Sequence, residues 1–191
     1  MLCLSTDSNV PQIPYESLVM GSKIGEGSFE SVHKAHWHST PVAVKTLKIR
    51  RIKLVPKAFA REVKVLSKVR HPHIILFMAY SVSNSALHLV SEYIPGSNLD
   101  DLLFGDVSQK IPLPEKCRIA EKISQAVAYL HNSNPTVLHR DIKPENILLT
   151  DSFETVKLCD LGISKLLAIN SSATTMHKVC SLVPVSSKHR K

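Results

Sequence analysis

The octapeptide HRDIKPEN, residues 139–146, is the most informative stretch of this chain because it gathers complementary chemical groups within a few residues. Asp141 offers a carboxylate that can accept a proton from an attacking hydroxyl group. Asn146 offers an amide oxygen, and Asp160, in the later stretch DLG (160–162), offers a second carboxylate. Oxygen donors of this kind are the ligands that Mg²⁺ prefers. The pattern therefore predicts a base and a metal site carried by loops.

Two stretches closer to the N-terminus offer groups that bind phosphate. In GEGSF (25–29), the glycines let backbone N–H groups approach phosphate oxygens without a clash with Cβ atoms. In VAVK (42–45), Lys45 lies on a predicted strand, and Glu62 on a following helix can pair with its ammonium group. A dinucleotide-binding fold would need a helix directly after the glycines, but here a strand follows, so that class is excluded. By itself, a glycine-bearing hairpin turn would explain GEGSF equally well.

The periodicity of apolar residues predicts an α+β fold. Residues 18–50 alternate in a way that predicts three strands, and the stretches 71–82 and 86–94 predict two more. Between them, a helical period begins at Pro56. These elements predict a five-stranded antiparallel sheet with one helix. The second half of the chain predicts a short helix after Pro95, a longer helix over 114–132 and a small hairpin that carries HRDIKPEN and DLG.

Composition narrows the class of protein. The chain has 191 residues, 43% of them hydrophobic, and no apolar stretch long enough for a signal peptide or a membrane helix. Its four cysteines form no C-x-x-C pair. We therefore expect a cytoplasmic protein with no membrane partner. The net charge is +8, but the basic residues are mostly dispersed and only 5% of the residues are aromatic, so we expect no nucleic-acid partner.

Together, the ordered stretches GEGSF, VAVK, HRDIKPEN and DLG resemble the eukaryotic protein kinases, over about residues 18–178. Lys143 within HRDIKPEN is similar to the lysine of serine/threonine-type kinases, which contacts the transferred phosphate. The stretches HPHII and VSEYIPGSNLDDLL are most like the corresponding sequences of the tyrosine-kinase-like group, which includes the mixed-lineage and receptor-interacting kinases. The resemblance implies a bilobal fold, ATP and Mg²⁺ as cofactors, and transfer of a phosphoryl group to a protein hydroxyl.

The resemblance also implies roles for individual residues. Four apolar side chains would enclose the adenine: Ile24, Val32, Ala43 and Leu148. The backbone at Glu92 and Ile94 would bind the adenine edge, with Ser91 at the gatekeeper position. Four residues fall where the family stacks a regulatory hydrophobic column: Leu66, Phe77, His139 and Leu161. Gly25 and Gly27 would approach the phosphates; Lys45, Glu62, Asp141 and Lys143 would be catalytic, and Asn146 and Asp160 would bind the metal.

Two positions depart from the family pattern. Glu30 stands where the third glycine of the phosphate loop is expected, and a glutamate pointing inward at about 6 Å from a phosphate would cost on the order of 1–3 kcal/mol. We expect its side chain to turn to solvent, so that ATP binding is weakened but not abolished. Leu161 replaces an aromatic residue, which keeps Asp160 and provides a smaller apolar plug.

The resemblance divides the chain into a leader (1–17), an N-lobe (18–95), a partial C-lobe (96–170) and an activation-loop remnant with a basic tail that we expect to be disordered (171–191). Four hydroxyl residues would be targets of an upstream kinase: Ser171, Ser172, Thr174 and Thr175. After Lys178, the helices that form the substrate platform of the family are expected but do not follow. An alternative is therefore a truncated, catalytically silent product that acts at most as a nucleotide- or partner-binding module.

Overall fold

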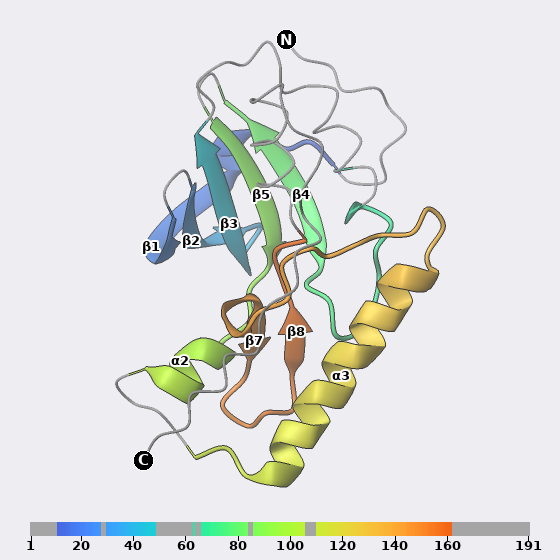
Figure 1. The fold of residues 1–191 in the computed structure, drawn as a ribbon. Helices are drawn as coiled ribbons and strands as arrows, with labels where there is room; N and C mark the ends of the chain where they lie inside the picture. The colour runs from blue at the N-terminus through green and yellow to red at the C-terminus, as the bar shows by residue number, and fades with distance from the viewer. Residues whose placement is uncertain are drawn as a thin grey trace, which may run out of the picture.

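The computed structural model describes residues 11–27, 30–48, 63, 66–83, 86–105 and 110–161. Within these residues, a strand-rich half and a half that contains the longest helix follow one another along the chain (Figure 1). The α+β class predicted from the sequence is confirmed.

The first half is a five-stranded antiparallel sheet, as predicted. Its strands are β1 (Leu18–Glu26), β2 (Glu30–Trp37), β3 (Thr40–Lys48), β4 (Phe77–Val82) and β5 (Ala86–Glu92), and their order in the sheet is β1-β2-β3-β5-β4. Because side chains alternate along a strand, β3 buries Val42 and Val44 on one face while Ala43 and Lys45 lie on the other. The face that carries Lys45 is the one that matters for the site.

The opposite face of the sheet is covered in part by the segment that precedes β1. Ile13 and Leu18 are buried together with small and β-branched residues of the strands, among them Ala35 and Val90. The Ile13 amide donates to the Tyr80 carbonyl at 2.9 Å, so this segment extends the edge of the sheet at β4. A short 3-10 helix, η1 (Tyr15–Ser17), then leads into β1. Part of the expected leader is therefore integral to this half.

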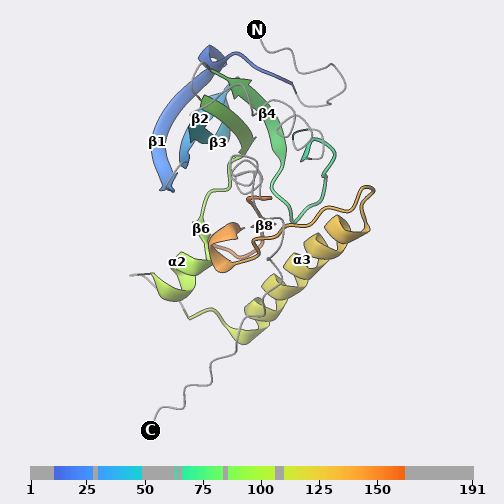
Figure 2. The ribbon, with the colours of Figure 1, turned by 45° about the horizontal axis from the view of Figure 1, so that its top comes forward.

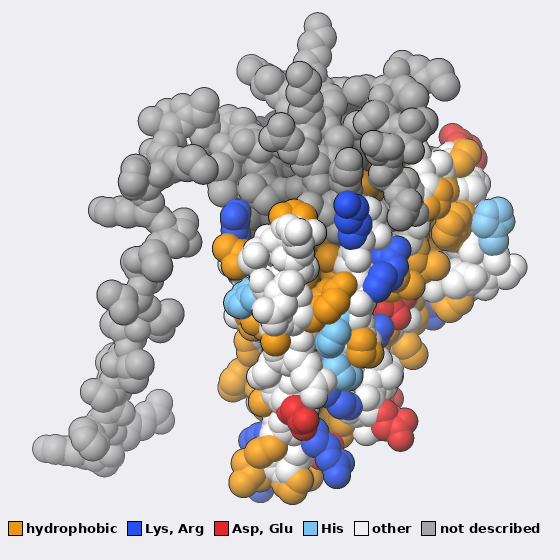
Figure 3. Space-filling model, turned by 90° about the vertical axis from the view of Figure 1, so that its right-hand side faces the viewer, with side chains coloured by type: hydrophobic (Ala, Val, Ile, Leu, Met, Phe, Trp, Pro, Cys, Tyr) orange, Lys and Arg blue, Asp and Glu red, His pale blue; other side chains and the backbone are white. Residues whose placement is uncertain are grey.

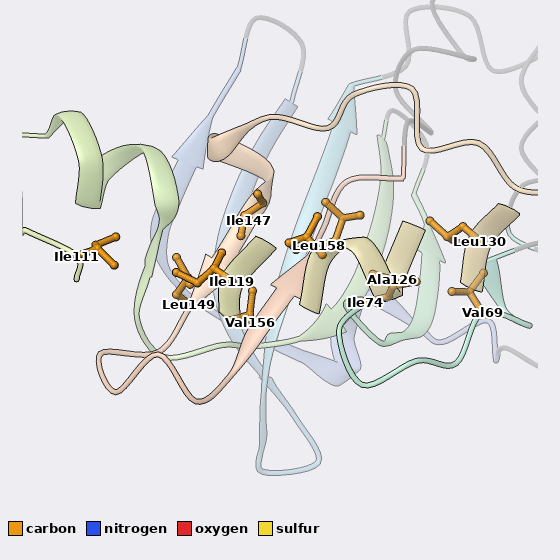
Figure 4. Close-up of a cluster of buried hydrophobic side chains, with 11 residues drawn as sticks. Val69, Ile74, Ile111, Ile119, Ala126, Leu130, Ile147, Leu149, Val156 and Leu158 are labelled. Atoms are coloured by element: carbon orange, nitrogen blue, oxygen red, sulfur yellow. The ribbon is translucent and has the colours of Figure 1, made fainter. Parts of the chain in front are cut away.

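The second half is built around α3 (Leu113–Asn132). Pro114 lies in the first turn, where a missing N–H costs nothing, and the helix buries a stripe of Ile119, Ile123, Ala126 and Leu130. This stripe packs on the hairpin of β7 (Ile147–Leu149) and β8 (Val156–Leu158), as Figure 4 shows. Burial of the Ile, Leu and Val side chains, at roughly 1.5–3 kcal/mol each, holds the hairpin in place.

Three short elements complete the second half. Strand β6 (Ser97–Asn98) pairs with β7, and α2 (Leu99–Phe104) follows at once. The Asn98 side chain caps α2 by accepting from the Asp101 amide at 2.8 Å. A 3-10 turn, η3 (Pro144–Asn146), precedes β7 and belongs to the HRDIKPEN loop. Figure 2 shows α2 and α3 below the five-stranded sheet, with β6 and β8 between them.

Backbone hydrogen bonds and ion pairs join the two halves. The segment before β4 runs beside β8, where the Leu158 amide donates to the His73 carbonyl at 2.9 Å and the Ile75 amide donates to the Leu158 carbonyl at 2.9 Å. On the same strand, Lys157 Nζ lies 2.7 Å from Glu92 Oε1 at the end of β5. These contacts fix the end of β8, and so the residues that follow it, against the sheet.

The surface of the described residues is mixed in charge. On the face drawn in Figure 3, Lys and Arg side chains lie between acidic, histidine and apolar side chains. None of the helices that the structure describes combines the length and the apolarity needed to cross a lipid bilayer.

Candidate active site

The HRDIKPEN loop is fastened to the strand end that precedes Asp160. His139 is buried, and its Nδ1 accepts from the Asp141 amide at 3.3 Å. Because Nδ1 is an acceptor, Nε2 carries the proton and donates to the Cys159 carbonyl at 2.9 Å. Arg140, between His139 and Asp141, has a φ of 63°, a strained conformation that turns the chain sharply at this point. The histidine thus holds Asp141 next to the DLG stretch.

Asp141 and Asn146 form one hydrogen-bonded unit. The Asn146 side chain is buried, and its Nδ2 donates to the Asp141 carbonyl at 2.8 Å and to the Asp141 carboxylate at 3.2 Å. Since the amide nitrogen faces Asp141, the amide oxygen is the atom of Asn146 that a cation could take. Lys143 Nζ lies 3.6 Å from Asp141 Oδ2, so a positive charge stands beside the candidate base.

Asp160 is brought to this unit by the backbone. The Cys159 amide donates to the Asn146 carbonyl at 2.9 Å, which places the next residue, Asp160, beside the HRDIKPEN loop. Asp160 has a φ of 59°, a conformation that few non-glycine residues adopt. In the described part of the chain, no set of three or more His, Cys, Asp or Glu side chains clusters as metal ligands would. Asn146 and Asp160 remain the candidate pair for a cation.

Lys45 reaches the same place from the sheet. Its Nζ lies 2.8 Å from Asp160 Oδ1, although the two residues are far apart in sequence. Burial by itself lowers the pKa of Lys45, but the Asp160 and Glu30 carboxylates outweigh it and raise the pKa above its ordinary value. Lys45 is therefore a fixed, fully charged ammonium group at physiological pH.

Glu30 does not turn to solvent, and that expectation is wrong. Its Oε2 lies 3.0 Å from Lys45 Nζ. The reason is the pleat of the sheet: Glu30 begins β2 and pairs with Leu47, while Val32 pairs with Lys45, so Glu30 projects from the face that carries Lys45. The opposite charge of the ammonium group then attracts the carboxylate. Lys45 is thus held between two carboxylates.

The predicted apolar walls of the site lie on both halves. Val32 on β2 pairs with Gly25 and with Lys45, and Ala43 on β3 pairs with Ser91, so these positions share one region of the sheet. Ile24 is on β1 with half of its surface exposed, and Leu148 is on β7. Glu92 ends β5, and Ile94 follows in the link to β6. Gly27 directly follows β1.

One residue that sequence reasoning missed is Lys157, which engages the Glu92 side chain. The same oxygen of Glu92 also accepts from the Leu76 amide at 2.7 Å. This carboxylate therefore fixes the link between the halves. The periodicity of β8 could have flagged Lys157, since it stands between the buried Val156 and Leu158.

Three of the residues expected in the hydrophobic column are in contact with the cores. Leu66 and Phe77 belong to one buried cluster, and Leu161 packs against that cluster and against the cluster around α3. His139, the fourth, is buried and hydrogen-bonded as described above. Five predicted residues lie outside the described part of the chain: Glu62, Ser171, Ser172, Thr174 and Thr175.

Comparison with known proteins agrees with this geometry. Residues 18–183 match the model of the protein kinase domain. Serine/threonine-protein kinase CTR1 of Arabidopsis thaliana is 39% identical over 168 residues, which is 86% of this chain and 20% of the relative. A protein of Dictyostelium discoideum named as a probable serine/threonine-protein kinase is 40% identical over 171 residues, 87% of this chain and 18% of the relative. U-box domain-containing protein 35 of Arabidopsis thaliana is 39% identical over 166 residues, 84% of this chain and 19% of the relative. The chain spans about a fifth of the length of these relatives.

Proposed function

The chain belongs to the protein kinase family, and from this premise we propose that it binds ATP with Mg²⁺ and transfers the γ-phosphoryl group to a serine or threonine hydroxyl of a protein. One observation carries the proposal: Lys45 Nζ of the sheet lies 2.8 Å from Asp160 Oδ1 of the other half. A cation that binds phosphate and a carboxylate that binds metal thereby meet at one point. Phosphoryl transfer depends chiefly on positioning and charge stabilisation of this kind.

The nucleotide would lie against the face of the sheet that carries Lys45. Ile24, Val32 and Ala43 would cover the adenine from the sheet, and Leu148 would cover it from β7. The backbone at Glu92 and Ile94 would bind the edge of the base, and Gly25 and Gly27 would leave room for the phosphates. The shared face of Val32, Ala43 and Lys45 supports this arrangement.

The donor set of Asn146 and Asp160 fits Mg²⁺. This ion commonly takes only one or two protein oxygens and completes its shell with water and substrate phosphates. When bound, Mg²⁺ supplies positive charge that neutralises the phosphate oxygens. The orientation of Asn146, whose amide nitrogen is engaged by Asp141, supports its oxygen as one ligand.

Asp141 would orient the substrate hydroxyl and accept its proton. Its backbone is held by His139 and its carboxylate by Asn146, so the base is positioned before substrate arrives. Lys143, 3.6 Å from the Asp141 carboxylate, would stand beside the transferred phosphate and stabilise its charge. Glu62 would support Lys45, and an upstream kinase would act on Ser171, Ser172, Thr174 or Thr175.

The test is transfer of radiolabelled γ-phosphate by the full chain to serine, threonine and tyrosine peptide libraries. Asp141→Asn keeps the size and shape of the side chain but removes the base, and should lower transfer by at least about 100-fold. Asp151→Asn, in the exposed turn between β7 and β8, is the matched control and should retain transfer. Nucleotide binding without transfer that depends on Asp141 would contradict the proposal and support a silent nucleotide-binding module.

A further inference from the structure

Glu30 occupies the part of the site where phosphates are expected. Its Oε2 lies 3.0 Å from Lys45 Nζ, and only 26% of the Glu30 side chain and 17% of the Lys45 side chain are exposed. The contact is fixed by the sheet, because the β2–β3 register sets Glu30 opposite Leu47 and places Lys45 diagonally across from it. This is therefore an ion pair with limited access to water, at the group that is proposed to bind phosphate.

Gly27 provides a second, independent observation. Its amide donates to the Glu30 carbonyl at 2.8 Å, which folds the end of the loop back on itself. A Cβ atom built on Gly27 would lie 3.0 Å from Cγ of Glu30, closer than ordinary packing allows. The glutamate side chain thus lies against Gly27 of the phosphate loop and ends on Lys45 of β3. Gly27 and Lys45 are the residues that are proposed to contact the phosphates.

The charges around Lys45 lead to a competition. One ammonium group faces two carboxylates, those of Glu30 and Asp160, at 3.0 and 2.8 Å. A triphosphate brings several more negative charges to the same ammonium, and like charges at such distances repel strongly in a partly buried site. Asp160 can turn to a cation, whereas Glu30 has no such alternative role in the site. The phosphates and the Glu30 carboxylate therefore exclude one another.

We propose that Glu30 is a built-in competitor of the nucleotide phosphates: its carboxylate holds Lys45 and so lowers the preference of the site for phosphorylated over unphosphorylated adenine ligands. The inference rests on the proposed nucleotide site. A binding-competent state populated to a fraction f weakens the apparent affinity by the factor 1/f. If Glu30 holds Lys45 in about nine molecules of ten, release of Glu30 strengthens ATP binding about tenfold. Adenosine has no phosphate to compete and should gain nothing.

The binding test compares the full chain with Glu30→Gln, which keeps the shape of the side chain and removes its charge. Calorimetry with Mg·ATP should give a dissociation constant about tenfold lower for the variant, while adenosine binds both proteins equally. Glu26→Gln is the matched control: it removes one charge from the same loop, but Glu26 pairs with the exposed Lys23 at 2.6 Å, so the change should be less than about twofold. Glu30→Gly, which restores the family residue, should repeat the effect of Glu30→Gln.

Equal ATP affinities of the wild type and Glu30→Gln would overturn the inference and leave the nucleotide site intact. A gain for ATP and adenosine alike would also overturn it, because that pattern reports a general change of the loop. If no protein binds either ligand, the proposed function fails. The Lys45 contact is then tested without nucleotide: peptide mapping after amine acylation should show Lys45 labelled several-fold faster in Glu30→Gln, and equal labelling would overturn the inference.

Discussion

Replacement of Lys157 by methionine should lower the free energy of unfolding by about 2 kcal/mol. Lys157 Nζ on β8 lies 2.7 Å from Glu92 Oε1 at the end of β5, and the two side chains are only 15% and 25% exposed. The pair joins the two halves of the chain. Methionine keeps much of the apolar stem of lysine but leaves the Glu92 carboxylate without its cation.

The magnitude follows from distance and burial. At 2.7 Å and an effective dielectric constant of about 20, the direct attraction is about 6 kcal/mol, and desolvation and side-chain ordering offset most of it. Exposed ion pairs contribute about 0–1 kcal/mol, whereas removal of one member of a fully buried pair costs about 3–5 kcal/mol. The exposure of this pair places it between these limits. Glu92 also keeps its hydrogen bond from the Leu76 amide, which limits the loss.

The chain contains a control at almost the same distance. Lys23 Nζ lies 2.6 Å from Glu26 Oε2, but these side chains are 47% and 68% exposed. Lys23→Met should cost less than about 0.5 kcal/mol, because water and salt screen an exposed pair. Because the two distances are nearly equal, the difference between the two losses of unfolding free energy reports the effect of burial.

Urea unfolding followed by far-ultraviolet circular dichroism measures both changes. Adding Glu92→Gln and the Lys157→Met/Glu92→Gln double variant completes a cycle, in which we expect a coupling energy of about 1–2 kcal/mol. Glutamine retains an oxygen that can accept from the Leu76 amide, so the cycle reports the charge pair. A Lys157→Met cost no larger than that of Lys23→Met, or a coupling energy near zero, would refute the reasoning.

Three further predictions concern single residues. Gly96 has a φ of 154°, and a Cβ atom there would collide with the Leu149 carbonyl oxygen. Gly96→Ala should therefore lower the free energy of unfolding by about 2–3 kcal/mol, measured by urea unfolding. An unchanged urea midpoint would contradict this. Burial raises the pKa of the Cys159 thiol to about 12. At pH 8, iodoacetamide should therefore modify Cys159 at least about 100-fold more slowly than the exposed Cys117. Comparable rates in peptide mapping would argue against a buried thiol. Burial lowers the pKa of His88 below its ordinary value of 6.5, so near that pH the unfolded chain binds more protons than the folded chain. Stability should therefore fall as the pH drops through 6.5. His88→Gln should flatten the dependence of the urea midpoint on pH, and an unaltered dependence would count against this reasoning.

The fold was predictable where periodicity and burial agree. The alternation over residues 18–50 and the strands on either side of residue 84 correspond to β1–β5, since one face of each strand must meet a core. Strand β6 escaped prediction because two residues carry no period. The pairing of Gln12 with Tyr80 escaped it because an isolated bridge depends on a contact distant in sequence.

Some residues of the candidate site could likewise be predicted from the sequence, and others could not. Asp141, Asn146 and Lys45 could be found because their chemistry lies in short local stretches, whereas the Glu92–Lys157 pair depends on the packing of two halves. Glu30 is the instructive error, because the sequence carried the information needed to avoid it. Val32 was expected to face the adenine, and a residue two positions earlier on the same strand faces the same side. That parity already directs Glu30 inward, where its carboxylate pairs with the ammonium group of Lys45 on the neighbouring strand. The departure from the family pattern is therefore better understood as an ion pair that nucleotide must break than as a missing glycine.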